Sequence, residues 1–522
     1  MDIRSLWEEK VRNKKKELFL VFQHHTITYG EFDVLVNRVA NSLARLGIDQ
    51  GDRVGGFMPN CPEWLVFFFA IAKLGGINVF VNTQYNPELL QHALNISRVK
   101  AVLLSSSLLP TYEKIRGLLK EVQIEVLVKD EAVPPNPLNM VSYQDLLSSS
   151  ADSPPGRNLH GSSPLQFIFT SGTTGLPKPC IVSHRYLLTL ADRIARRLEI
   201  TPQDRVFSCL PNYHGNIYIG TFSALMAGGV ALVERAFSAS RYWDWVRRYG
   251  ATVLTLHITP MNILLKQPPR ADDADNPARA GIFLVGEGAL RFLKRFGLSS
   301  GLAMYGSTEA GGFCTMDIFG PDSQHDPRWA GRPRDDVEVK IWDENDDEVS
   351  PGAEGEIVVR DKIAHTLFSG YFNMPEKTAE ACRNFWFHSG DLGYVDEEGA
   401  LYFLRRREES IRVKGDFIPV DRLEAHVLSH PKVLECAAVG VPSDLGEEDI
   451  KVYVRLHPDA SLTPEDLVAY CKDSLPGFMI PRYIEFVEDF PRASSAIKIQ
   501  KVKLKELGIG NAWDRLAQKR EK

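Results

Sequence analysis

The sequence predicts an α/β protein with two domains: a large N-terminal domain of layered parallel sheets and helices, and a small α+β C-terminal domain. Strand and helix patterns alternate between residues 26 and 290, which is typical of mostly parallel sheets covered on both faces. From residue 337, short alternating segments separated by turn residues indicate an antiparallel, β-barrel-like module. A charged run begins at Arg405. We therefore expect domains at residues 1–405, with the module at 337–404, and at 406–522.

The first part of the chain contains two rounds of alternating elements. Apolar residues at helical spacing predict a helix that ends near Gly47: Phe32, Val36, Val39, Leu43 and Leu46. The apolar run at residues 64–72 is too short to span a bilayer and is interpreted as a buried helix. Residues 133–164, rich in Pro, Ser and Asn, are expected to form a surface connection. The second round predicts a helix, a strand, a helix and a strand at residues 87–95, 101–104, 112–119 and 125–128.

The later elements follow from the same periodicity. Helices are predicted at residues 184–198 and 244–249, strands at 206–210 and 252–256, a loop at 266–280, and a strand, turn and helix at 282–290. Strands of the β module are predicted at residues 337–342, 355–360 and 400–404. In the C-terminal domain we expect a helix at 420–428, strands at 437–441 and 451–456, and a further helix with Thr463 as N-cap and Pro464 at its first position.

Composition excludes several classes of protein. A chain of 522 residues exceeds one ordinary hydrophobic core, and 44% hydrophobic with 25% charged residues is typical of soluble proteins. A net charge of −6 gives no electrostatic reason to expect nucleic acid. Seven cysteines without a Cys-x-x-Cys pair argue against a disulfide framework and a structural zinc site. With no apolar signal-peptide core at the N-terminus and no membrane span, we expect a reducing, cytoplasmic compartment.

A loop rich in hydroxyl groups and glycine follows the apolar residues 167–169. Nested backbone N–H groups and hydroxyls match phosphate oxygens, and glycine allows close approach to a ligand. No Gly-Lys-Ser/Thr sequence closes the loop, so it is not the Walker pattern. By composition alone it is also compatible with an ordinary turn. We predict a polyphosphate site formed by Thr170, Ser171, Gly172, Thr173, Thr174 and Lys178.

Residues 167–178 resemble the phosphate-binding signature of the adenylate-forming superfamily: acyl-CoA synthetases, firefly-type luciferases and peptide-synthetase adenylation domains. Later segments match that family in the same order, so the resemblance covers nearly the whole chain. It implies that Tyr305, followed by Gly306, stacks on adenine, that Thr308 contacts the α-phosphate and that Glu309 helps to hold Mg²⁺. A carboxylate together with phosphate oxygens suits Mg²⁺ well.

Two more segments belong to the nucleotide site that the resemblance implies. Asp391 stands where family members hold the ribose hydroxyls, a role that suits a carboxylate with two acceptor oxygens. The same residue is also compatible with a simple β-turn. Gly286, Glu287 and Gly288 occupy the place of an adenine-contacting segment, where Glu287 is unusual and is equally compatible with a side chain that faces solvent.

The acyl group is expected near two further segments. The resemblance places His214 beside the acyl carboxylate, although a lone histidine is as often structural. Aromatic and apolar residues with nearby glycines indicate a roomy apolar pocket. The residues assigned to it are Tyr213, Ile217, Tyr218, Gly311 and Gly312.

The C-terminal domain departs from the family pattern at two places. The resemblance makes Lys498 the catalytic lysine that bridges the carboxylate and the α-phosphate, but Ile497 replaces the usual preceding glycine. It also places Arg406 against ribose or phosphate and makes Glu408 the hinge on which the small, mobile domain swings. The family usually has aspartate at this hinge. These departures make thioester formation a weaker expectation than adenylation.

The sequence therefore predicts an ATP- and Mg²⁺-dependent ligase that converts a carboxylic acid into acyl-AMP and then into a thioester of CoA. Segments at 251–255, 267–269 and 328–332 resemble the carnitine/crotonobetaine-CoA ligase branch. One alternative is an enzyme that only adenylates and passes acyl-AMP to a separate carrier or partner enzyme. Another is a catalytically inactive nucleotide sensor, which intact Lys178 and Glu309 argue against. The expected substrate is an apolar acid, and a homodimer is one expected assembly.

Overall fold

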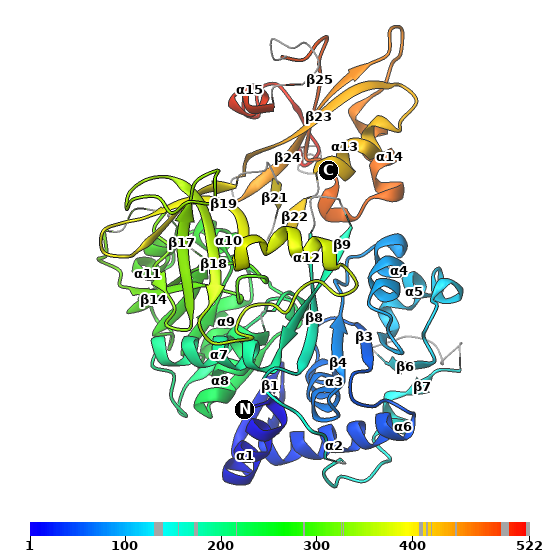
Figure 1. Cartoon of the computed structure of the whole chain (residues 1–522), viewed down its shortest axis with the longest axis vertical. Coiled ribbons are helices and arrows are strands. Elements are labelled where there is room, and N and C mark those ends of the chain that lie inside the picture. The colour runs from blue at the N-terminus through cyan, green and yellow to red at the C-terminus, as the bar shows by residue number, and fades with distance from the viewer. Residues whose placement is uncertain are drawn as a thin grey trace. The chain divides into compact units, whose positions relative to one another are not determined.

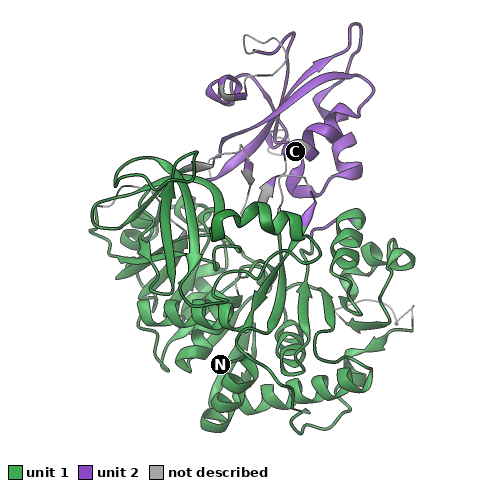
Figure 2. Cartoon of the chain, viewed as in Figure 1, with its two compact units in different colours: residues 1–83, 87–170, 178–405 green, residues 84–86, 171–177, 406–522 purple. Residues whose placement is uncertain are grey.

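The computed structural model describes residues 1–129, 139–154, 156–171, 176–215, 217–284, 288–324, 326, 328–406, 411–413, 416–418, 420–443, 446–491, 499 and 501–517. The chain divides into two compact units (Figure 2). Unit 1 comprises residues 1–83, 87–170 and 178–405, and unit 2 comprises residues 84–86, 171–177 and 406–522.

The first sheet of unit 1 is seven-stranded, in the order β7-β6-β5-β3-β4-β8-β9, and the pairs from β7 to β8 are parallel (Figure 1). Within it, Gly56 is needed for packing, because a Cβ atom there would lie 2.1 Å from the Phe80 ring. The strands are β3 Arg53–Phe57, β4 Ile77–Phe80, β5 Ala101–Ser105, β6 Ile124–Val128, β7 Val141–Ser142, β8 Pro164–Ser171 and β9 Pro177–Ser183.

The second sheet is nine-stranded, in the order β16-β15-β14-β13-β12-β10-β11-β1-β2. Its six central strands are parallel, whereas β2, β15 and β16 pair antiparallel. The carboxyl ends of β10, β12, β13 and β14 therefore meet at one edge. The strands are β1 Leu18–Phe22, β2 His25–Thr28, β10 Arg205–Ser208, β11 Val230–Val233, β12 Val253–Thr255, β13 Ala280–Leu284, β14 Ser300–Tyr305, β15 Thr315–Phe319 and β16 Arg332–Pro333.

Helices bury the faces of both sheets, and the largest hydrophobic cluster joins residues of α2, α3 and α7 to both of them. The predicted buried helix is confirmed as α3, in which residues 64–72 are at most 1% exposed. The helices of unit 1 are α1 Ile3–Lys14, α2 Tyr29–Arg45, α3 Pro62–Lys73, α4 Pro87–Ile96, α5 Leu109–Glu113, α6 Tyr143–Leu146, α7 His184–Arg197, α8 Ser223–Ala227, α9 Tyr242–Tyr249, α10 Ile258–Lys266, α11 Gly288–Phe296 and α12 Pro375–Ala381.

Two local expectations were wrong. The helix predicted at residues 112–119 is instead α5, which ends at Glu113 and is followed by a 3₁₀ turn at Arg116–Leu118. The Tyr112 hydroxyl donates to Glu125 on β6 at 2.8 Å. The surface connection predicted at 133–164 contains β7 and α6. There Val141 pairs with Val126, and Ser142 caps α6 in a capping box with Asp145.

The remaining part of unit 1 is an antiparallel sheet with its own small hydrophobic cluster. Its strands, in spatial order, are β17 Val337–Trp342, β18 Gly355–Asp361, β19 Phe387–Val395 and β20 Leu401–Arg406. This sheet supplies the 388–391 segment of the expected ribose site, on β19.

Unit 2 is an α+β unit with a separate core. Its larger sheet has the order β23-β24-β25-β26, and β21 and β22 form a hairpin. Thr463 caps α14 by accepting from the Asp466 amide, as predicted. The elements are β21 Ile411–Val413, β22 Asp416–Ile418, α13 Val420–Leu428, β23 Val433–Pro442, β24 Glu448–Leu456, α14 Pro464–Ser474, β25 Tyr483–Phe486, α15 Lys501–Glu506 and β26 Trp513–Asp514.

The predicted α/β fold class is thus confirmed. No helix within the described ranges is both long and apolar enough to cross a membrane.

Helix α1 is attached to α7 through His184. The backbone N–H of Ile3 donates to His184 Nδ1 at 3.2 Å, which requires a neutral imidazole. Burial lowers the pKa of His184 from 6.5 to about 4, although Asp2 opposes the shift. As pH falls through this window, the unfolded chain binds a proton that the folded site does not, so folding loses stability.

We predict that unit 1 loses about 3 kcal/mol of stability between pH 6.5 and pH 4 through His184 alone. His184→Gln keeps an acceptor for the Ile3 amide but cannot titrate, so its stability should fall less over this range. Urea unfolding followed by circular dichroism at each pH measures the difference. His24→Gln, at an exposed position, serves as the control and should behave as wild type. Equal pH dependence in wild type and His184→Gln would contradict the assignment.

Candidate functional site

The Glu309 carboxylate lies where three distant segments of unit 1 meet. Glu309 follows β14 and is 7% exposed. Its Oε1 accepts from Thr170 Oγ1 at the end of β8 and from the hydroxyl of Tyr371, each at 2.8 Å. The structure therefore brings together two motifs that the sequence analysis treated separately. It also adds Tyr371, which the sequence analysis missed because no local pattern marks it.

Lys178, on β9, belongs to the same cluster. Its Nζ lies 4.4 Å from the centroid of the Tyr371 ring, within the range of a cation–π interaction. Burial lowers the pKa of Lys178, and the nearby Glu309 carboxylate opposes that shift. A partly desolvated ammonium beside a carboxylate and hydroxyl groups is suited to an anionic, metal-associated ligand.

Tyr305 and Asp391 form a second pair. The Tyr305 hydroxyl donates to Asp391 Oδ2 at 2.7 Å, and the Tyr305 ring stacks on Phe403 at 5.7 Å between centroids. Burial and the Asp391 charge both raise the pKa of Tyr305, so its hydroxyl stays a neutral donor. The residues predicted to contact adenine and ribose are therefore neighbours.

Glu356, on β18, holds residues 388–391 of the neighbouring strand β19 in place. The sequence analysis missed this residue. Its Oε1 accepts from the Gly390 amide at 3.0 Å, and its Oε2 accepts from His388 Nδ1 at 3.0 Å and from Arg383 at 3.1 Å. Burial alone would raise the pKa of Glu356, but these hydrogen bonds outweigh it and lower the pKa. Gly390 has φ of 70°, which glycine adopts without strain.

A compact turn follows Tyr305. A Cβ atom on Gly306 would lie 2.5 Å from the Gly312 carbonyl oxygen, and Gly311 and Gly312 both have φ near 80°. The buried Arg334 guanidinium donates to the carbonyls of Gly311 at 2.9 Å and Phe313 at 2.7 Å. The Tyr186 hydroxyl donates to the Thr308 carbonyl at 2.9 Å, which fixes that residue's backbone.

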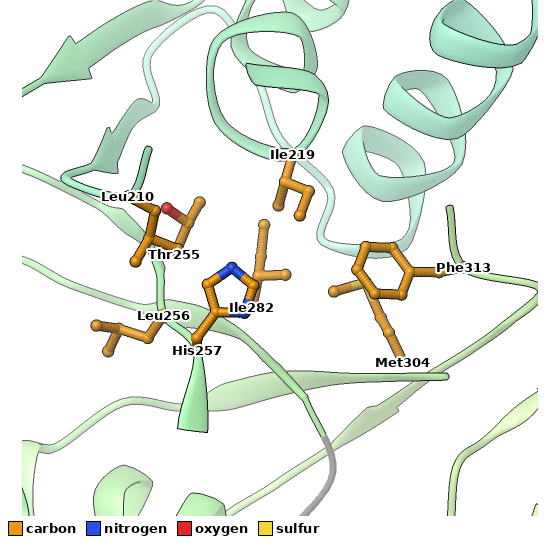
Figure 3. Close-up of a pocket in the computed structure, with 8 residues that line it drawn as sticks. All are labelled: Leu210, Ile219, Thr255, Leu256, His257, Ile282, Met304 and Phe313. Carbon is orange, nitrogen blue, oxygen red and sulfur yellow. The ribbon is translucent and has the colours of Figure 1, made fainter. Parts of the chain in front are cut away.

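An apolar cavity lies near the carboxyl ends of β10, β12, β13 and β14. In Figure 3 the His257 imidazole projects among aliphatic side chains, with Met304 and Phe313 together at one side of the cavity. The lining residues are Leu210, Ile219, Thr255, Leu256, His257, Ile282, Met304 and Phe313. Leu210, Leu256, His257 and Met304 lie at or just after the end of a parallel strand, a position that could have identified them from the sequence.

The residues predicted for the acyl pocket lie beside this cavity's lining in the chain but do not line it. Ile217 and Tyr218 are buried in the main core, and the Tyr218 hydroxyl donates to Gln166 Oε1 at 2.6 Å. Tyr213 is buried, whereas His214 is exposed with its ring centroid 4.4 Å from that of Tyr213. Gly311 and Gly312 precede the lining residue Phe313.

Several predicted site residues lie outside the described part of the chain, and their roles stay predictions. Gly288 is described and begins α11, where a Cβ atom would lie 2.6 Å from Asn262 Oδ1. The residues outside are Gly172, Thr173, Thr174, Gly286, Glu287, Glu408 and Lys498, together with the side chains of Ser171 and Arg406.

We predict that Glu356→Gln weakens ATP binding roughly fivefold to tenfold, because loss of a charged hydrogen-bond acceptor loosens the 388–391 segment. Isothermal titration with ATP measures the effect, and amide exchange of residues 388–391 should quicken in parallel. Glu338→Gln is the control, since Glu338 pairs with Arg360 on the exposed side of the neighbouring strands. Since the pKa of Glu356 is lowered, its contribution should vanish only as pH falls below the ordinary range of a glutamate side chain. Unchanged affinity and exchange would exclude this supporting role.

Comparison with known proteins agrees with this geometry. A family model described as AMP-binding enzyme matches residues 7–372, and one described as AMP-binding enzyme C-terminal domain matches residues 422–496. The crotonobetaine/carnitine–CoA ligases of Salmonella arizonae and Proteus mirabilis are each 29% identical to this chain, covering 96% of it and 98% of their own length.

Solved structures share the fold. An amide bond synthetase from Marinactinospora thermotolerans superposes with a TM-score of 0.84 at 22% identity, covering 97% of this chain and 99% of its own. An o-succinylbenzoate CoA synthetase from Bacillus subtilis gives 0.81 at 25% identity, covering 96% and 98%. The resemblance seen in the phosphate loop thus extends over the whole chain, and the chain belongs to the AMP-binding enzyme family.

Proposed function

We propose that the chain is an AMP-forming acyl-CoA ligase. A carboxylate oxygen attacks the α-phosphorus of ATP, which forms acyl-AMP and releases pyrophosphate. The CoA thiolate then attacks the acyl carbon, which forms the thioester and releases AMP. The observation that carries the proposal is the convergence of Thr170, Lys178 and Glu309 within unit 1.

The chain's own residues divide the binding of ATP between them. Lys178 and Thr170 would meet the phosphates, where a desolvated ammonium interacts strongly with charge. Tyr305 and Asp391 would receive the adenosine part, and Thr308 would contact the α-phosphate. Lys498, outside the described residues, is the proposed donor that stabilises charge on the carboxylate and the α-phosphate as acyl-AMP forms.

Mg²⁺ fits Glu309, because the ion is usually held by one or two carboxylates together with substrate phosphates. Bound there, Mg²⁺ would offset the negative charge of ATP as the carboxylate approaches. The described residues contain no cluster of three or more His, Cys, Asp or Glu side chains suited to a metal, so ATP would complete the coordination. Thr170 and Tyr371 keep the carboxylate in place.

We propose that the apolar cavity receives the acyl group. Its eight described lining residues include one aromatic ring other than His257 and no carboxylate. A trimethylammonium acyl group, of the kind named for the relatives, would be stabilised by several aromatic faces or by a carboxylate. The lining therefore favours an uncharged, apolar acyl group.

We predict ATP–pyrophosphate exchange that depends on a carboxylic acid, strongest for apolar acids that carry no second charge. Purified protein is assayed with labelled pyrophosphate across a panel of acids, and CoA is then added. Acyl-CoA formation supports the ligase. Exchange without acyl-CoA would instead select the adenylating enzyme that serves a carrier or partner protein. Absence of exchange with every acid would refute both.

Gel filtration tests the predicted homodimer.

We predict that Met304→Ala, which enlarges the cavity, shifts preference toward acids longer by one or two methylenes. The ratio of kcat/KM for longer over shorter acids should rise about tenfold, since one methylene in an apolar pocket is typically worth this much. Met316→Ala is the matched control, because Met316 pairs with Met304 across β14 and β15 and is equally buried but does not line the cavity. Equal ratios in the two variants would exclude the cavity as the acyl site.

A further inference from the structure

Both described donors to the Glu309 carboxylate bind the same oxygen. Thr170 Oγ1 and the Tyr371 hydroxyl each donate to Oε1 at 2.8 Å. No described residue donates a hydrogen bond to Glu309 Oε2. A carboxylate held through one oxygen keeps its orientation while its second oxygen remains available to a ligand.

Tyr371 is itself held rigidly in place. Residues 369–372 run along β9, where the Ile181 amide donates to the Gly370 carbonyl and the Phe372 amide donates to the Pro179 carbonyl, each at 2.9 Å. The Tyr371 amide donates to Thr378 Oγ1 at 2.9 Å, and its side chain is 7% exposed.

The ring and the hydroxyl of Tyr371 contact two different predicted site residues. The face of the ring holds the Lys178 ammonium at 4.4 Å, and the hydroxyl holds Glu309. Burial first, and then the Glu309 charge, raise the pKa of Tyr371, so the hydroxyl is a permanent donor. One side chain thus spans the phosphate-binding lysine and the metal-binding carboxylate.

We propose that Tyr371 is a positioning residue that couples nucleotide binding to metal binding, its hydroxyl fixing Glu309 for a divalent cation and its ring fixing Lys178 for phosphate. This inference rests on the proposed function. Two parts of Tyr371 then affect the affinity for ATP differently. The hydroxyl affects it only when the metal is present, whereas the ring affects it with or without metal.

The test measures ATP affinity by equilibrium dialysis in Mg²⁺ and in EDTA, without an acid substrate, so that no turnover contributes. In Tyr371→Phe the gain in affinity from Mg²⁺ should shrink roughly tenfold, as expected for loss of one hydrogen bond to a charged group. Affinity in EDTA should stay within about twofold of wild type. Tyr371→Leu, which lacks the ring as well, should also bind ATP more weakly in EDTA.

Two further variants make the result decisive. Thr170→Val removes the other donor to the same oxygen and should likewise shrink the gain in affinity from Mg²⁺, in addition to the loss of its own phosphate contact in EDTA, so the inference stays testable if Tyr371→Phe is unstable. Tyr112→Phe is the matched control, because the Tyr112 hydroxyl donates to Glu125 Oε1 at the same 2.8 Å but far along the chain from the site. It should leave both affinities unchanged.

The outcomes separate this inference from the proposed function. A wild-type protein that binds no ATP would overturn the proposed function and, with it, this inference. Mg²⁺-enhanced binding that persists undiminished in both Tyr371→Phe and Thr170→Val would overturn the inference alone. Equal weakening of Tyr371→Phe in Mg²⁺ and in EDTA would likewise overturn it, because a merely structural tyrosine would affect both conditions.

Discussion

The Glu309 carboxylate is the constraint on which the site depends. A buried charge is costly unless hydrogen bonds satisfy it, and Thr170 and Tyr371 supply them from positions 139 and 62 residues away in the chain. These bonds connect the end of β8, the turn after β14 and the segment beside β9. This one carboxylate therefore links the two predicted motifs directly.

The sheets decide where that carboxylate can lie. In open α/β folds, ligands bind beyond the carboxyl ends of parallel strands. Glu309 follows β14, and the apolar cavity is lined from the ends of β10, β12, β13 and β14. The proposed nucleotide site and the proposed acyl site therefore share one edge of one sheet. The antiparallel sheet adds Asp391, which reaches the same region through its hydrogen bond with Tyr305.

Residues with strong local signals were predictable, and residues that support them were not. The glycines, hydroxyls and lysine of the phosphate loop form a pattern in consecutive positions. Tyr371, Glu356 and Arg334 carry no such pattern, because each acts on a segment that is distant in sequence. The residues predicted for the acyl pocket come from two short segments, whereas the residues that line the apolar cavity come from several strands and loops.

The sequence by itself determined the α/β class, the family, and most helices and strands, since periodicity and short motifs are local properties. Only the tertiary structure decided that Thr170, Lys178 and Glu309 meet around Tyr371, and that Tyr305 donates to Asp391. It also decided which apolar side chains leave a cavity. These outcomes depend on how sheets pack and on which buried polar groups must find partners, and neither is encoded in any short stretch of chain.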